Sequence, residues 1–323
     1  VITSDQRDVV QEAYTLEVAV NKDFEHIIMA SDWVLSQQSA HIHLKGFDLE
    51  TGLRYYVRVK IRDNYDNTSP WSAPTSFVTG ILGPKMWQSE FITGETIDDA
   101  EVSKGTYLRY AFDLDKKVKE AYAYTTALGL YHLYINGEKA GDMELAPGWT
   151  SYNRRLQYQT TDITDLLVKG ENVIGAHVGA GWYKGLMGLV KSRNNYGQIT
   201  GFMGQLLIRY EDGSEVIITS DGSWRCSDSP VVFSEIYDGE IYDASMEQVG
   251  WNQVGFDSSN WQEVATLSYD LNQIEAQHGS LVKIIETRLP KEIIRTPKGE
   301  NVIDFGENMS GWVRFNVNGK EWD

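Results

Sequence analysis

Two segments of the chain combine an indole, phenol rings and side-chain amides with turn-forming glycines. The first reads APGWTSYN (146–153) and the second GAGWYKGLMG (179–188), with two asparagines shortly after it at 194 and 195. An indole held on a glycine-rich loop suits stacking on the apolar face of a pyranose, and nearby amides can bind its hydroxyl groups. This chemistry gives a set of candidate carbohydrate-binding residues: Trp149, Tyr152, Asn153, Trp182, Tyr183 and Asn195.

The same residue types also have a purely structural interpretation. Buried aromatic side chains are more common than ligand platforms, so Trp149 and Trp182 would then cap the ends of a sandwich core. Residue type alone leaves both interpretations open.

The acidic stretch EIYDGEIYDASME (235–247) is a second candidate for chemistry. Asp238 and Glu240 would share one face of a strand, roughly 6.5 to 7 Å apart at the backbone. That span overlaps the carboxyl separation of about 6.5 to 9.5 Å in inverting glycosidases. The Asp-Gly pair, however, predicts a turn, and clustered carboxylates with loop carbonyls also suit a calcium ion. Structural, metal-binding and catalytic roles stay open for these two acids.

Composition and motifs exclude several other classes of site. His41 and His43 are the one closely spaced histidine pair and have plain surface character, and neither a phosphate-binding glycine loop nor a serine nucleophile elbow is present. The net charge of −17 argues against nucleic acid and against an anionic membrane as partners. No apolar run reaches the roughly 18 residues of a membrane span. The single cysteine, Cys226, excludes an intramolecular disulfide and leaves the localisation undetermined.

Strand-like alternation positions these residues. AYTLEVAV (13–20), AHIHLKGF (40–47) and RYYVRVKIRD (54–63) read as strands, and NTSPWSAPTSFVTG closes the set. Several short strands without a helical period predict a small β-sandwich over residues 1–82, similar to fibronectin type III and Ig-like modules.

A second β-block spans residues 83–279. It contains further alternating segments, including TYLRYAFDL, LQYQTTDIT and GFMGQLLIRYEDG, a hairpin turn at Asn136-Gly137 and a short helical turn over 162–167. A third element, 280–323, ends in VRFNVNGKEWD, a strand pattern and an Asn-Gly turn with no second strand after it. We therefore expect an all-β chain that is part of a longer protein.

The motif series resembles a known family over nearly the whole chain. The run ALGLYHLYINGEKAGDMELAPGWTSYNRRLQYQTTDITDLLVKGENVIGAHVGAGWYKG closely resembles the N-terminal β-domain of bacterial α-L-rhamnosidases. ENVIDFGENMSGWVRFNVNG resembles the opening of the next domain in these enzymes, whose typical form is DFGQN followed by GW. The Ig-like block ending in SPWSAPTSFVTG is similar to their N-terminal module.

This resemblance implies a fold and an activity. The family consists of inverting glycoside hydrolases that release terminal L-rhamnose, with their catalytic acids in an (α/α)6 barrel that would follow this chain in the same polypeptide. The 83–279 block would be a jelly roll like galactose-binding domains, and 280–323 the truncated start of a further β-sandwich. In some members such a jelly roll binds L-rhamnose with a calcium ion through an Asp-Asn pair. The nearest match here is Tyr152-Asn153, in which the Asn agrees and the Asp does not.

Three hypotheses about function follow. In the first, the chain is the non-catalytic N-terminal region of an α-L-rhamnosidase, serving as scaffold and as a sugar-binding surface, and neither Asp238 nor Glu240 is catalytic. Its partners would be a rhamnose-containing carbohydrate and the C-terminal catalytic barrel. In the second, it is an independent, calcium-assisted L-rhamnose-binding module. In the third, it is a structural or adhesive β-sandwich protein.

Overall fold

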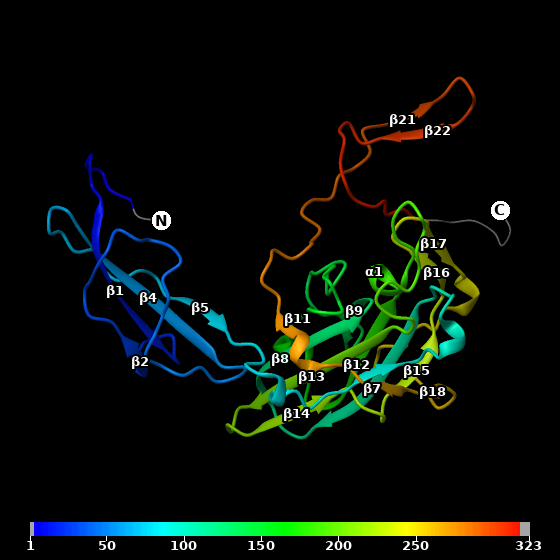
Figure 1. Cartoon of the computed structure of the whole chain (residues 1–323), viewed down its shortest axis with the longest axis horizontal. Coiled ribbons are helices and arrows are strands. Elements are labelled where there is room, and N and C mark those ends of the chain that lie inside the picture. The colour runs from blue at the N-terminus through cyan, green and yellow to red at the C-terminus, as the bar shows by residue number, and fades with distance from the viewer. Residues whose placement is uncertain (1–2, 317–323) are drawn as a thin grey trace. The chain divides into compact units, whose positions relative to one another are not determined.

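The computed structural model describes residues 3–316. The chain divides into two compact units, Val1–Val282 and Lys283–Asp323. Strands are the main regular secondary structure of both units, and the helices are single turns (Figure 1). The predicted all-β class is confirmed. Within residues 3–316, no helix has the length and apolar character needed to cross a lipid bilayer.

One sheet forms the N-terminal part of the first unit. Its strand order is β2 (Ile27–Ala30), β1 (Gln11–Ala19), β4 (Arg54–Asp63) and β5 (Thr75–Val78), with β3 (Val34–Leu35) also paired to β1. Along β4 the odd-numbered residues from Tyr55 to Ile61 face an apolar core that includes Leu16 and Val18 of β1. The intervening residues, among them Arg58 and Lys60, lie on the opposite face of the strand.

The strand predicted over residues 40–47 does not form. Ile42, Leu44 and Phe47 do pack against the core of the N-terminal sheet, so the apolar positions of this segment are partly buried, as their pattern predicts. The backbone of this segment nevertheless pairs with no strand. His41 takes a φ of 56°, outside the extended region, and this interrupts the run that a strand needs. The prediction was wrong because period-two burial does not require backbone pairing.

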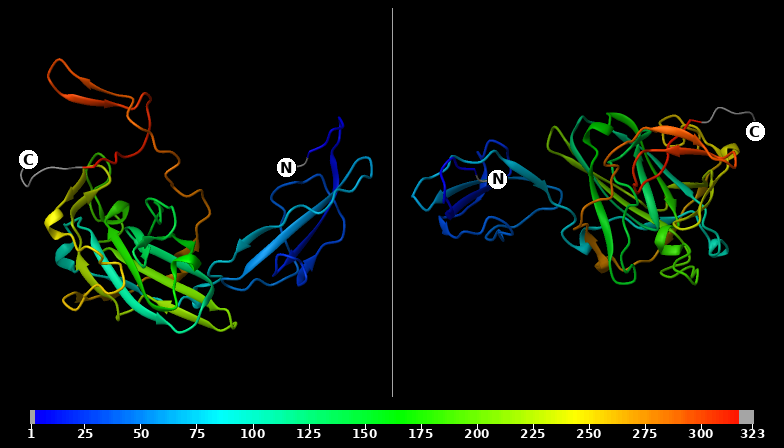
Figure 2. Two further views of the ribbon diagram at one scale, coloured as in Figure 1. Left: turned by 180° about the vertical axis from the view of Figure 1, so that it is seen from behind. Right: turned by 90° about the horizontal axis from the view of Figure 1, so that it is seen from above.

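The larger part of the first unit is a sandwich of two sheets (Figure 2). The six-stranded sheet has the order β10 (Glu138–Lys139), β9 (Leu130–Ile135), β12 (Gly170–Gly179), β7 (Thr106–Leu114), β15 (Arg225–Asp228) and β18 (Gln262–Glu263). The seven-stranded sheet has the order β19 (Ala265–Leu267), β6 (Phe91–Thr93), β13 (Gly201–Tyr210), β8 (Val118–Leu128), β11 (Leu156–Asp162) and β20 (Ile274–Ala276), with β14 (Glu215–Thr219) beside β13.

Large side chains face small ones where β8 and β13 meet at the core. Ala121, Ala123 and Ala127 of β8 lie opposite Ile208, Leu206 and Phe202 of β13, and all six are buried between the sheets. Alternating volumes of this kind fill an interior without voids. The inner surface of the seven-stranded sheet is therefore closely packed.

The other face of the same sheet is also buried. Between the alanines of β8, Tyr122 and Tyr124 point outward into a second cluster. We call this cluster the outer aromatic layer; its buried members are Trp87, Phe91, Tyr122, Tyr124, Leu128, Tyr152, Leu156, Tyr158, Tyr183, Met203 and Leu207. Because both faces are covered, every residue of β8 from Ala121 to its end is buried.

Gly129 is the point at which the chain leaves one sheet and enters the other. It separates β8, in the seven-stranded sheet, from β9, in the six-stranded sheet. Its φ is +136°, and a Cβ there would lie 2.4 Å from the carbonyl oxygen of Gly179. Only glycine fits this corner.

Two local predictions are confirmed. Asn136 and Gly137 have φ values of 52° and 92° and join β9 to β10 in a tight hairpin, as the Asn-Gly pair predicts. The short helical turn expected over 162–167 is a 3-10 helix at Thr164–Leu166.

The second unit contains one antiparallel hairpin, β21 (Glu292–Arg295) with β22 (Asn301–Asp304), within its described residues. Residues 313–316, the described part of the segment predicted as a strand, carry no strand, and the remainder of that prediction lies outside the described residues.

A buried and an exposed leucine together test the packing of the sandwich core. Leu206 is 1% exposed and Leu189 is fully exposed. We expect Leu206→Ala to lower the free energy of unfolding by about 2–5 kcal/mol, because it leaves a cavity between the sheets. Leu189→Ala should change it by less than about 0.5 kcal/mol. Urea unfolding followed by tryptophan fluorescence measures both, and equal effects would contradict the described core.

His177 on β12 should make the sandwich sensitive to acid. It packs against the Tyr107 ring, with ring centroids 4.8 Å apart, and its Nε2 lies 3.0 Å from Ser229 Oγ. Burial, with a smaller contribution from His132, lowers the pKa of His177 to about 4. Between pH 6.5 and 4, His177 is therefore protonated in the unfolded chain and neutral in the folded chain. The free energy of unfolding decreases as the pH falls through this window.

The expected loss at His177 is roughly 3 kcal/mol at most across that window. His177→Gln, which cannot titrate, should show a shallower decline in unfolding free energy between pH 6.5 and 4.5. His278→Gln, at a largely exposed histidine, is the control and should follow the wild type. A wild-type curve for His177→Gln would refute the assignment.

Candidate functional site

The structure brings the two candidate indoles together. Trp149 lies in the connection between β10 and β11, and Trp182 lies in α1 (Gly181–Lys184), just after β12. Their rings are nearly parallel, with an interplanar angle of 8° and centroids 5.9 Å apart. Trp149 is 52% exposed, and its Nε1 donates a hydrogen bond of 3.2 Å to the hydroxyl of Tyr196. We call Trp149, Trp182 and Tyr196 the aromatic platform.

The spacing of the two rings restricts how a sugar could bind. A ring held between two indoles needs a van der Waals contact on each side, which requires about 7 Å between the indole planes. A centroid separation of 5.9 Å leaves no such gap between Trp149 and Trp182. A pyranose would therefore stack on the open surface of the platform.

Tyr152 and Tyr183 lie beneath the platform. They are 1% and 9% exposed and pack edge to face, with centroids 5.4 Å apart. The Tyr152 hydroxyl donates a 2.8 Å hydrogen bond to the Gly148 carbonyl, and Tyr152 also contacts Tyr196. Burial raises the pKa of both phenols. These tyrosines belong to the outer aromatic layer and support the indoles from below.

The two candidate asparagines are both exposed but have different surroundings. Asn153 directly follows buried Tyr152 in the chain. Asn195 accepts a 2.6 Å hydrogen bond from the Ser192 hydroxyl and donates a 2.8 Å bond to the Ser192 carbonyl. Asn195 therefore closes its own loop, whereas Asn153 presents an amide at the surface.

Residues that the sequence did not single out complete the arrangement. Tyr196 bridges the two candidate loops through Trp149 and Tyr152. Lys184 ends α1 and is fully buried against Glu95. Nothing in the local sequence distinguishes Lys184 from an exposed lysine, because its partner lies 89 residues away in the chain.

The residues at Tyr152-Asn153 do not fit a carboxylate-bound calcium ion. Tyr152 is a buried phenol whose hydroxyl is already bonded to the Gly148 carbonyl, so it offers no carboxylate to a cation. Among the described residues, no group of three or more His, Cys, Asp or Glu side chains is placed to hold a metal ion. A hard cation prefers several oxygen ligands, commonly carboxylates, and none is supplied by this residue pair.

Asp238 and Glu240 lie at a hairpin turn. Asp238 is in the connection between β16 (Val231–Glu235) and β17 (Gly239–Tyr242), and Gly239 has a φ of +88°. Lys191 Nζ lies 3.1 Å from Asp238 Oδ1. Glu240 is exposed in β17. The Asp-Gly turn is confirmed, and the arrangement presents no enclosed carboxylate pair.

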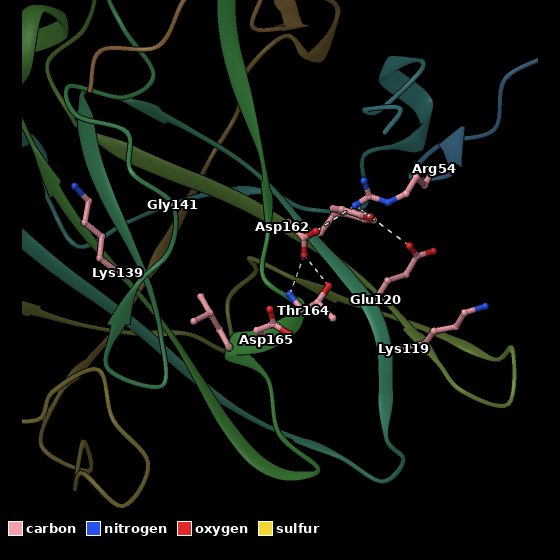
Figure 3. Close-up of a pocket in the computed structure, with 10 residues that line it drawn as sticks. Arg54, Lys119, Glu120, Lys139, Gly141, Asp162, Thr164 and Asp165 are labelled. Atoms are coloured by element: carbon pink, nitrogen blue, oxygen red, sulfur yellow. Dashed lines mark hydrogen bonds and ion pairs between the residues drawn. The ribbon is translucent and has the colours of Figure 1, made fainter. Parts of the chain in front are cut away.

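A polar depression of about 560 Å³ lies elsewhere in the first unit (Figure 3). Arg54 Nη2 donates to the Tyr122 hydroxyl at 2.7 Å and lies 3.3 Å from Asp162 Oδ2. Asp162 Oδ1 accepts from the Thr164 backbone and hydroxyl at 3.1 and 2.6 Å. The Asp162 carboxylate is thus engaged in structural contacts on both of its oxygens.

Family models match both parts of the first unit. A model described as "Alpha-L-rhamnosidase N-terminal domain" matches residues 116–286, and one described as "Rha78A-like, N-terminal immunoglobulin domain" matches residues 1–83.

Individual relatives give the same result. An α-L-rhamnosidase of Formosa agariphila is 31% identical over 340 residues, which cover 96% of this chain and 36% of the relative. One of Streptomyces avermitilis is 41% identical over 220 residues, covering 67% of this chain and 21% of the relative. The crystal structure of the native enzyme from Aspergillus terreus has a TM-score of 0.86 at 34% identity, covering 95% of this chain and 36% of that one. The chain thus spans about a third or less of these relatives' length.

Adjacent residues in the first loop should respond differently to substitution. Tyr152→Phe removes the hydrogen bond to the Gly148 carbonyl, so we expect a loss of about 0.5–1.5 kcal/mol in unfolding free energy. Asn153→Ala should change it by less than about 0.5 kcal/mol, because the side chain is exposed. Chemical unfolding of the two variants tests this order. Reversal of the order would show that Tyr152 is not the buried support.

Proposed function

The chain belongs to the α-L-rhamnosidase family, and on that premise we propose that it is the non-catalytic N-terminal region of an enzyme that hydrolyses terminal α-L-rhamnosides. The supporting observation is that the N-terminal family models match here, over a chain that spans only about a third of its relatives. In this proposal the catalytic domain is another part of the same polypeptide.

The geometry of the acids agrees with this proposal. Hydrolysis of a glycoside needs two carboxyl groups facing the same bond. Asp238 is paired with Lys191 at a surface turn, and Asp162 is held by Arg54 and Thr164. Within the described residues, the buried carboxylates Glu95 and Glu235 are each paired with a cation.

The first test is hydrolysis by this chain alone. We expect the purified 323-residue chain to release no p-nitrophenol from p-nitrophenyl α-L-rhamnoside above the buffer rate. Asp238→Asn and Glu240→Gln serve as matched controls, because they neutralise the carboxylate pair whose spacing first suggested a glycosidase. Enzyme-like turnover that either substitution abolishes would overturn the non-catalytic assignment.

A second candidate function is L-rhamnose binding on the aromatic platform. A half-exposed Trp149 stacked on the partly buried Trp182 favours it, because an indole held in place by a second indole offers a fixed apolar face to a sugar. The exposed Asn153 amide would supply hydrogen bonds to the sugar hydroxyls. Since Tyr152 and Asn153 supply no carboxylate, binding should not need calcium.

Calorimetric titration tests the platform. We expect L-rhamnose to bind equally in calcium and in EDTA, and Trp149→Ala to raise the Kd by roughly tenfold or more, equivalent to about 1.4 kcal/mol. Trp33→Ala is the matched control, because Trp33 is 40% exposed in the N-terminal sheet region and should not affect binding. No heat at millimolar sugar, or equal losses in both variants, would leave the region with a scaffold role only.

A further inference from the structure

The segment that carries Trp182 has little secondary structure to hold it in place. Apart from the single turn of α1, residues 181–200 contain no strand and one isolated bridge, Met187 with Ser192. Trp182 nevertheless lies nearly parallel to Trp149 from a different loop. Its position therefore depends on side-chain contacts with the rest of the sandwich.

Glu95 fixes the start and the end of this segment. Its Oε2 accepts a 2.9 Å hydrogen bond from Lys184 Nζ and a 2.8 Å bond from the Thr200 backbone amide. The Glu95 and Lys184 side chains are both completely buried. Lys184 is only two residues from Trp182, so this contact holds the end of α1 against the sandwich.

Glu235, at the end of β16, fixes the middle of the segment. Its Oε2 accepts a 2.7 Å hydrogen bond from the Leu186 backbone amide, and its Oε1 lies 2.7 Å from Arg193 Nη2. Gly185 allows this approach, since a Cβ there would lie 2.5 Å from Glu235 Oε2. Two carboxylates thus hold the segment at four points: Lys184, Leu186, Arg193 and Thr200.

A contribution to folding stability does not by itself explain two buried carboxylates paired with cations. Withdrawing a carboxylate and a cation from water costs about as much as their attraction returns, and apolar replacements are often neutral or stabilising. The Oε1 atom of Glu95 is moreover buried without a hydrogen-bond partner among the described residues. The anchors do, however, specify direction, which an apolar contact cannot do.

We propose that Glu95 and Glu235 are positioning residues for the aromatic platform: each fixes part of the 181–200 segment so that Trp182 stacks against Trp149. That the platform binds L-rhamnose rests on the proposed function, whereas the stacking of Trp182 on Trp149 does not depend on it. Each anchor acts by fixing the loop that carries Trp182.

The experiment uses the full chain and reads the stacking without sugar. Two stacked indoles give an exciton couplet in the far-ultraviolet circular dichroism spectrum. We call the part of this signal that disappears in Trp182→Phe the platform couplet. This subtraction is needed because Trp251 and Trp261 also stack, with centroids 6.3 Å apart. The variants are Glu235→Gln and the double variant Glu95→Gln/Lys184→Met, which replaces the buried ion pair by a neutral pair.

We expect both variants to keep a cooperative thermal transition, to lose more than half of the platform couplet and to bind L-rhamnose at least threefold more weakly. Glu17→Gln is the control: it breaks the Glu17–Arg58 pair in the N-terminal sheet and should leave both readouts unchanged. If Glu235→Gln does not fold, Arg193→Lys tests the same anchor with the charge retained.

Retention of the platform couplet in folded variants of both anchors would overturn the positioning role, whatever the sugar affinity. A wild type that shows the couplet but binds no L-rhamnose would instead remove the proposed sugar function. In that case loss of the couplet in the variants would still support the two anchors.

Discussion

Burial of the seven-stranded sheet on both of its faces is the constraint from which the rest of the sandwich follows. On the inner face, alanines of β8 receive the larger side chains of β13 across the strand pair. On the outer face, Tyr122 and Tyr124 extend into the outer aromatic layer. A sheet that is apolar on both sides must be covered on both sides, and the loops after β10 and β12 provide part of the outer cover. The aromatic platform is therefore built on a rigid base, because its supporting tyrosines are members of that layer.

This arrangement separates two kinds of aromatic residue that look alike in the sequence. Tyr152 and Tyr183 are adjacent in the chain to Asn153 and Trp182, yet both are buried support. Trp149 is half exposed, and its ring lies nearly parallel to that of Trp182. The structural interpretation therefore applies to the buried tyrosines of these loops. The ligand-binding interpretation applies to the indoles. In the same way, Asp238 serves a turn, and the carboxylates that organise the platform are the buried Glu95 and Glu235.

Local patterns in the sequence were sufficient for much of the fold. The segment TYLRYAFDL corresponds to β7, Thr106–Leu114, and the Asn136-Gly137 turn lies where its chemistry requires. Residues 40–47 show the limit of such patterns, because alternating burial there occurs without a paired strand. Contacts between distant residues could not be predicted at all. The Glu95–Lys184 pair and the parallel stacking of Trp149 on Trp182 depend on how the two sheets bring the loops together, which no local spacing encodes.

On the proposed function, a sugar contacts the open surface of the aromatic platform and no other indole of the sandwich. The most direct test is a ¹H–¹⁵N correlation spectrum of the indole Nε1–H groups, recorded during titration with L-rhamnose. The cross-peaks of Trp149 and Trp182 should shift together in a saturable manner, while those of buried Trp224 and distant Trp33 stay in place. Unchanged peaks for the platform pair, or a shift of Trp33 as large as theirs, would contradict it.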